Sequence, residues 1–187
     1  MPNTGHGVVQ QGSASGSPAT SRIAHSGSRR AESLAARIEE GAARLAAFAE
    51  GLSNADWQTP ISATDRRSVG VVVHHVANMY PIEIDLARTI ARGKAISDVT
   101  WEVVAQLNAN HARDNAQVSK PAALELLRRN SLETAAAVRA FTDEELDSAA
   151  PLSLSFDAPV TAQFVIEDHA LRHSWHHLAA IRKALGR

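Results

Sequence analysis

Apolar side chains recur at steps of three and four residues along most of this chain, which is the spacing of an amphipathic α-helix. A first helix is predicted from residue 29 to about Gly51. A second is predicted over residues 69–92, where Ser68 can cap the N-terminus and Gly93 can end the helix. Pro81 lies inside this second helix and removes one backbone hydrogen bond, so we expect the helix to bend there.

The same spacing predicts three more helices, over residues 99–119, 121–141 and 161–185. The expected fold class is therefore all-α, with four long helices and one extra short helix around a single core.

Two segments between these helices have other patterns. The sequence Thr142-Asp143-Glu144-Glu145 favours a short capped turn. Residues 152–156 alternate between apolar and polar side chains, which is typical of a short extended piece or a hairpin arm. Asp157-Ala158-Pro159 is expected to end that piece.

Residues 1–28 are rich in Gly, Ser, Thr, Pro and Gln and have hardly any large apolar side chains. Such a segment cannot bury enough surface to offset the entropy of ordering it, so a disordered tail is predicted. His6 and His25 fall in this tail and are interpreted as incidental. The folded domain is expected to comprise residues 29–187.

Composition narrows the classes of function. The 187 residues carry a net charge of −1, which argues against a surface that binds nucleic acid through bulk positive charge. No cysteine is present, so disulfides and cysteine-based zinc sites are excluded, and a nucleophilic thiol would have to come from a ligand. No apolar run reaches the ~18 residues of a membrane span, and no signal peptide is visible, so a cytoplasmic location is expected.

Histidines are concentrated near the C-terminus, where four of the nine lie between His169 and His177. On a regular helix His169, His173 and His177 share one face, because residues four apart lie above one another. That face also carries apolar or small residues, namely Ala162, Ile166, Ala180 and Ala184. Two histidines four residues apart can hold one divalent metal, but a third ligand must come from elsewhere. The alternatives are partly buried histidines bonded to backbone carbonyls, or a His-rich exposed face.

The second predicted helix offers the third ligand. On a helical wheel His75 lies in the middle of an apolar stripe, whereas His74 lies about 100° away toward its edge. The stripe consists of Val71, Val72, Met79, Ile82, Leu86 and Ile90. Burying an imidazole there is costly unless a metal or a hydrogen bond satisfies its nitrogens. One inward histidine on this helix, with two or three on the last helix, indicates a three-histidine site.

These residues also carry a family resemblance. His75-Val76-Ala77, after a run of aliphatic residues, resembles the His-(Leu/Val)-Ala signature of the DinB-like (YfiT-like) superfamily of metal-dependent enzymes. Residues 173–181, His-Ser-Trp-His-His-Leu-Ala-Ala-Ile, resemble its last-helix motif His-x-x-x-His-x-x-Gln-Ile. Trp57 and Pro60, before the second helix, are also similar to the family. The resemblance covers residues 29–187.

The resemblance implies a four-helix bundle of up-down-down-up topology that binds a divalent metal. It assigns His75, His173 and His177 as the metal ligands, and the ion could be Ni, Zn, Fe or Mn, since imidazole suits several of these. Ala180 stands where the family usually has Gln, which removes a hydrogen bond of that Gln and leaves the ligand set unaffected.

Two further residues are candidates for roles near the ligands. His169 lies one turn before His173 and could be a fourth ligand, a proton shuttle or a hydrogen-bond partner behind a ligand. Asn78 lies one turn after His75 and could contact a ligand or a substrate, or bond only to its own helix.

Three neutral imidazoles leave the full 2+ charge on a metal, which would acidify bound water or bind a thiol as thiolate. The resemblance implies either transferases and isomerases that use low-molecular-weight thiols or hydrolases. The last-helix motif lacks the Glu of His-Glu-x-x-His proteases, which weighs against a peptidase. The leading hypothesis is a metal-dependent enzyme acting on a small molecule by thiol transfer or hydrolysis. The alternatives are a non-catalytic metal-binding or sensing bundle, and a bundle whose histidines are structural.

The last predicted helix has a second apolar stripe, about 120–200° around from His173. It consists of Phe164, Leu171, Trp175, Leu178 and Leu185. The first helix, the segment around Trp57 and Trp101, or a second subunit could cover it, since large exposed apolar patches are unusual in monomers. A homodimer that uses part of this surface is the favoured interpretation.

Overall fold

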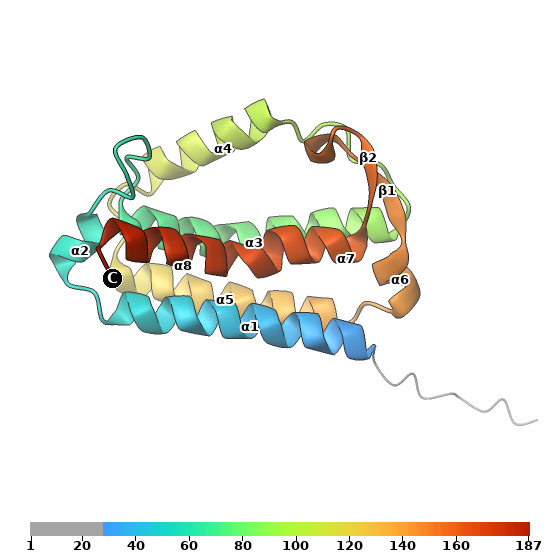
Figure 1. Ribbon diagram of the computed structural model, residues 1–187, viewed down its shortest axis with the longest axis horizontal. Helices are drawn as coiled ribbons and strands as arrows, with labels where there is room; N and C mark the ends of the chain where they lie inside the picture. The colour runs from blue at the N-terminus through green and yellow to red at the C-terminus, as the bar shows by residue number, and fades with distance from the viewer. Residues whose placement is uncertain (1–27) are drawn as a thin grey trace, which may run out of the picture.

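Four long helices lie side by side along the length of the molecule (Figure 1). The computed structural model describes residues 28–187. Three of the helices are α1 (Arg29–Glu50), α3 (Val69–Ala91) and α5 (Lys120–Arg139). The fourth is continuous through α7 (Ala162–Val165), a π-helical segment (Ile166–Leu171) and α8 (Arg172–Ala184).

The order of the helices confirms the predicted bundle topology. α1 packs against α5 and α8, and α3 packs against α5 and against all three parts of the last helix. α3 and α5 run in one direction, while α1 and the last helix run in the other (Figure 1). Two consecutive bundle helices that are parallel need a connection that returns along the bundle, and α4 (Trp101–Asp114) supplies it. This is the up-down-down-up, all-α arrangement that the sequence predicts.

α4 is shorter than the helix predicted over residues 99–119, and it lies outside the core, since none of its residues is buried. It is held at its two ends. Before it, Ile96 pairs with the hairpin strand β1 (Ala149–Leu152) through a hydrogen bond to the carbonyl of Pro151 (2.9 Å). After it, the Trp57 indole N–H donates to the carbonyl of Val118 (3.0 Å). α4 therefore spans one side of the bundle and contacts it through partly buried residues such as Val104.

The predicted ends of the second helix are confirmed in α3. The Ser68 side chain accepts a hydrogen bond from the N–H of Val71, and Gly93 follows the helix with a φ of +68°. α3 also continues through Pro81, although the carbonyl of Ala77 loses the N–H that it would otherwise bind there. The side-chain amide of Asn130, on α5, donates to that carbonyl (2.8 Å). A residue of a neighbouring helix thus replaces the missing backbone donor.

A hairpin forms near the predicted extended piece, but its placement in the prediction was wrong. β1 pairs antiparallel with β2 (Ala158–Thr161), and a 3₁₀ turn (Ser153–Ser155) separates the strands. Residues 157–159 do not end the structure: Pro159 lies inside β2, opposite Pro151. In a sheet of only two strands a proline can face outward, because it needs no donor toward a further strand.

Two short helices cap the ends of the bundle. α2 (Asn54–Gln58) occupies the segment interpreted as a plain connection, and Ser53 with Asp56 forms its capping box. α6 (Asp143–Asp147) confirms the capped turn expected at Thr142, with Glu145 as the partner of the cap.

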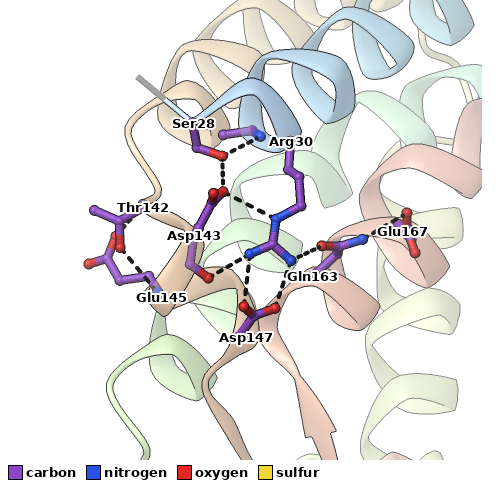
Figure 2. Close-up of polar contacts among 9 residues, drawn as sticks. Ser28, Arg30, Thr142, Asp143, Glu145, Asp147, Gln163 and Glu167 are labelled. Atoms are coloured by element: carbon purple, nitrogen blue, oxygen red, sulfur yellow. Dashed lines mark hydrogen bonds and ion pairs between the residues drawn. The ribbon is translucent and has the colours of Figure 1, made fainter. Parts of the chain in front are cut away.

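A polar network at the start of α1 fastens α6 and the last helix to the bundle (Figure 2). Arg30 donates to the carboxylates of Asp143 (3.1 Å) and Asp147 (2.7 Å) and to the side chain of Gln163 (3.3 Å). Ser28, which caps α1, also bonds to Asp143. Ion pairs this exposed add little to stability, so the network mainly fixes the positions of α6 and the last helix.

The predicted tail, with His6 and His25, lies outside the described residues except for Ser28.

Among residues 28–187, no helix combines the length and the apolar character that a bilayer crossing requires.

Candidate metal centre

Ring nitrogens of His75, His173 and His177 converge on one point between α3 and α8. One nitrogen from each ring lies within 4.8 Å of the others, and the Nε2 atoms of His75 and His173 are 3.2 Å apart. Two nitrogens that bind one zinc ion tetrahedrally at 2.0–2.1 Å are about 3.4 Å apart. Three residues so placed could hold a single divalent ion, and they are the ones that the sequence proposes as ligands.

The two histidines of α8 owe their arrangement to regular helix geometry. His173 and His177 are one turn apart, and their rings stack with centroids 4.8 Å apart and an interplanar angle of 30°. The His75 ring meets both nearly edge-on, at 5.0 Å from His173 and 5.4 Å from His177. α3 thus closes the site from the side that α8 leaves open.

The π-helical segment just before His173 changes the predicted face of the last helix. The prediction placed His169 on the face of His173 and His177, assuming 3.6 residues per turn throughout. A π-turn is wider, with i→i+5 hydrogen bonds, so spacing by four no longer aligns residues across it. His169 lies outside the group whose nitrogens converge. No residue pattern in the sequence signals this π-turn.

The apolar stripe predicted around His75 is only partly the core face of α3. Val71, Val72 and Ile90 of that stripe are buried, whereas Ile82 is 40% exposed and Met79 and Leu86 are only partly buried. Tyr80 and Ile84, which lie outside the stripe, are fully buried instead. The apolar positions of α3 extend over more than half of its circumference, so periodicity alone does not say which part of that surface is buried. His75 is still buried, 5% exposed, but it lies at the edge of the core, and Asn78 is exposed.

A further histidine, which the sequence interpretation did not connect with the site, comes from α4. His111 Nε2 and His74 Nδ1 form a hydrogen bond of 2.9 Å, and the His111 ring lies 5.5 Å from that of His75. The only sequence signal was its position on the same helical face as Val104 and Leu107. His111 brings α4 against the site at one point.

Glu83 is the second residue that sequence reasoning missed. Its carboxylate forms a hydrogen bond with Nδ1 of His173, and its side chain is 2% exposed. The available signal was a charged residue between Ile82 and Ile84, on the same face as Tyr80. This signal could be interpreted only with knowledge of which face of α3 is buried.

A hydroxyl pair fixes α3 against α8 beside the ligands. Tyr80 and Ser174 are fully buried, and their hydroxyl groups form a hydrogen bond of 2.6 Å. Ser174 directly follows His173, and Tyr80 is less than one turn before Glu83. The bond therefore sets the relative height of the helices that carry the ligands.

The electrostatic setting keeps two of the ligand candidates, His75 and His177, neutral. Burial, reinforced by the neighbouring His173, lowers the pKa of both His75 and His177 to about 2. Burial also lowers the pKa of His74 and of His111. Imidazoles that are neutral at physiological pH keep a lone pair free for a metal.

The second apolar stripe of the last helix is largely covered within the chain. Leu171 and Leu178 are buried, and Trp175 lies against α1, where a Cβ at Gly41 would be 2.7 Å from its indole nitrogen. Arg44 of α1 stacks on Trp175 as well (5.2 Å). Phe164 remains 43% exposed. The stripe itself therefore gives no support to a homodimer, which stays a prediction.

Comparisons with known proteins give the family and the fold of the chain. A family model of the DinB superfamily matches residues 37–181. The solved structure of YfiT from Bacillus subtilis is similar, with a TM-score of 0.66 and 20% sequence identity over 86% of this chain and 89% of that chain. It is described as a probable metal-dependent hydrolase with an unusual four-helix bundle topology. No curated protein matches the chain.

Proposed function

The chain belongs to the DinB superfamily, and on that basis we propose that it is a metal-dependent enzyme acting on a small molecule. His75, His173 and His177 are the proposed ligands of one divalent ion. The observation that carries this proposal is the convergence of one nitrogen from each of the three rings within 4.8 Å. Ni, Zn, Fe and Mn are the candidate ions, because imidazole is a good ligand for each.

A divalent ion with three neutral imidazole ligands supplies Lewis acidity, which lowers the pKa of a bound water or thiol. The chain contributes the geometry around the ion. His173 and His177 approach from one helix and His75 from another, so all three protein ligands lie on the α3–α8 side. Three protein ligands leave coordination positions for a water molecule or a substrate.

Two reaction classes fit this centre. Hydrolysis is supported by the description of YfiT as a probable metal-dependent hydrolase. Transfer of a low-molecular-weight thiol is one of the activities that the family resemblance implies, and it is compatible with the absence of cysteine if the nucleophilic sulfur comes from a cosubstrate. The only acidic residue that touches a ligand candidate in the described part of the chain is Glu83, and its carboxylate is engaged with His173. Hydrolysis would need a general base to deprotonate the attacking water, whereas a thiol bound to the ion as thiolate needs none.

The test is turnover by the metal-free protein reloaded separately with each candidate ion. One panel contains activated esters and amides, and the other contains electrophiles together with a small thiol. We expect metal-dependent turnover in one panel, its loss in His173→Ala, and its retention in His176→Ala, because His176 is exposed on the same helix.

The alternative function is a non-catalytic metal-binding or sensing bundle. The same experiment separates the two functions. Tight metal binding without turnover in either panel would favour the sensing bundle over the enzyme.

A further inference from the structure

A buried carboxylate behind the metal centre has no cationic partner of its own. Glu83 is 2% exposed, and its only partner in the described part of the chain is Nδ1 of His173. Its second oxygen, Oε2, is buried without a hydrogen-bond partner among residues 28–187. Within the same range no Lys or Arg lies within salt-bridge distance of Glu83. A buried charge in this position is costly unless something compensates it.

The contact with Glu83 also decides which nitrogen of His173 is free. An ionised carboxylate only accepts hydrogen bonds, so Nδ1 of His173 donates and its lone pair is on Nε2. Nε2 is the atom that lies 3.2 Å from Nε2 of His75. Glu83 therefore selects the tautomer that presents a lone pair to the proposed metal position.

From these contacts we propose that Glu83 is a positioning residue that acts on the metal through His173. This inference rests on the proposed metal centre. The carboxylate holds the ring in one tautomer and orientation and makes Nε2 a stronger donor. When ionised, Glu83 would also place one negative charge behind the three imidazoles, which would reduce the net charge of the loaded centre from +2 to +1.

A second contact between α3 and α8 stabilises the position of Glu83 relative to His173. Tyr80 lies three residues before Glu83 on α3, and Ser174 directly follows His173 on α8. The hydroxyl groups of Tyr80 and Ser174 are fully buried and form a hydrogen bond of 2.6 Å. This bond limits sliding of α3 against α8. The Glu83–His173 contact is therefore held in place by a second contact that touches no metal ligand candidate.

The test compares Glu83→Gln with wild type, using Co²⁺ as the probe. The glutamine keeps the shape and can still accept a hydrogen bond, but it carries no charge. Loss of a carboxylate behind a ligating histidine weakens metal binding about 10–100-fold. We expect a loss of that size in a chelator competition titration, together with a shifted visible absorption spectrum of the bound Co²⁺. The melting temperature of the metal-free protein should stay close to that of wild type.

Two variants complete the experiment. Asp85→Asn is the matched control, because Asp85 is an exposed carboxylate on the same helix and pairs only with Arg88; its Co²⁺ affinity should equal that of wild type. Glu83→Asp keeps the charge and should recover part of the lost affinity, and it replaces Glu83→Gln if that variant does not fold.

The outcomes separate this inference from the proposed function. If wild type binds no Co²⁺, the metal centre itself fails. If wild type binds Co²⁺ and Glu83→Gln has the same affinity and spectrum, only the role of Glu83 is overturned. A Glu83→Asp protein that binds no better than Glu83→Gln would overturn it as well.

Discussion

Two of the ligand candidates differ in how the second ring nitrogen is held. Nδ1 of His173 bonds to Glu83, whereas Nδ1 of His75 is buried without a partner in the described part of the chain. From the sequence, the pair on the last helix follows from helical spacing, because residues four apart share a face, and the family resemblance adds His75 to that pair. It could not predict Glu83 or His111 as neighbours, since both contacts join residues that are far apart in the chain.

The first prediction concerns metal content. His75→Ala, His173→Ala and His177→Ala should each lose most of the bound metal, because two remaining imidazoles make a poor site. His176→Ala should keep about one ion per chain, since this exposed residue lies outside the converging group. Elemental analysis after dialysis measures the difference. Full occupancy in any of the first three variants would remove that residue from the ligand set.

A second prediction concerns the pH dependence of the metal-free protein. In the folded state His75 and His177 have a pKa of about 2, whereas in the unfolded chain they protonate near pH ~6.5. The unfolded state therefore binds more protons between these values, and the free energy of unfolding falls as the pH falls below ~6.5. Each such histidine contributes a slope of at most about 1.4 kcal/mol per pH unit.

Denaturant unfolding of chelator-treated protein at pH 7.5 and pH 5.5 measures this slope. The His75→Asn variant removes one of the two groups and should show a smaller loss of stability between the two pH values. An equal loss in the variant and in wild type would show that His75 is not the group responsible.

At the scale of helices and strands, the sequence predicts where a helix forms better than it predicts which face of the helix is buried. Helix ends at Ser68 and Gly93 follow from local capping chemistry, which the sequence contains. The buried face of α3 does not, because apolar positions extend over more than half of the helix circumference and the packing of α5 and the last helix decides which of them are buried. The π-helical segment was missed for a related reason: a helical wheel assumes one period, and nothing local marks the change.

A third prediction belongs to α3 and its proline. Asn130→Ala leaves the carbonyl of Ala77 without the donor that replaces the missing N–H of Pro81. Leaving a buried acceptor unpaired costs about 1–3 kcal/mol, so the free energy of unfolding should fall by that amount. In a Pro81→Ala background the backbone N–H returns, and Asn130→Ala should cost less. A double-mutant cycle by denaturant unfolding measures the coupling, and additive effects would contradict this account of the contact.

At the scale of the whole molecule, α4 is the element whose place the sequence did not reveal. Its apolar spacing is that of a core helix, yet none of its residues is buried. Its position follows from topology: α3 and α5 are parallel, so the chain must return between them. The resemblance to the DinB-like superfamily supplied this topology, which hydrophobic periodicity alone does not specify.

A fourth prediction links the metal to the stability of the folded chain. If an ion binds only the folded bundle and its free concentration is about 100 times its Kd, it raises the free energy of unfolding by about 2.7 kcal/mol. Chelation at pH 7.5 should then lower the melting temperature by roughly 5–10 °C for a domain of this size. The effect should be smaller at pH 5, because protons compete for histidine ligands. Thermal melts with and without chelator measure it, and identical curves at pH 7.5 would contradict metal binding to the folded state.

The most direct test of the central claim is a crystal structure of the metal-loaded protein, with diffraction data collected at the absorption edge of the bound ion. The account predicts one anomalous peak per chain, about 2.0–2.2 Å from a ring nitrogen of each of His75, His173 and His177. Loaded crystals with no peak between α3 and α8, or with the ion bound to other residues, would contradict it.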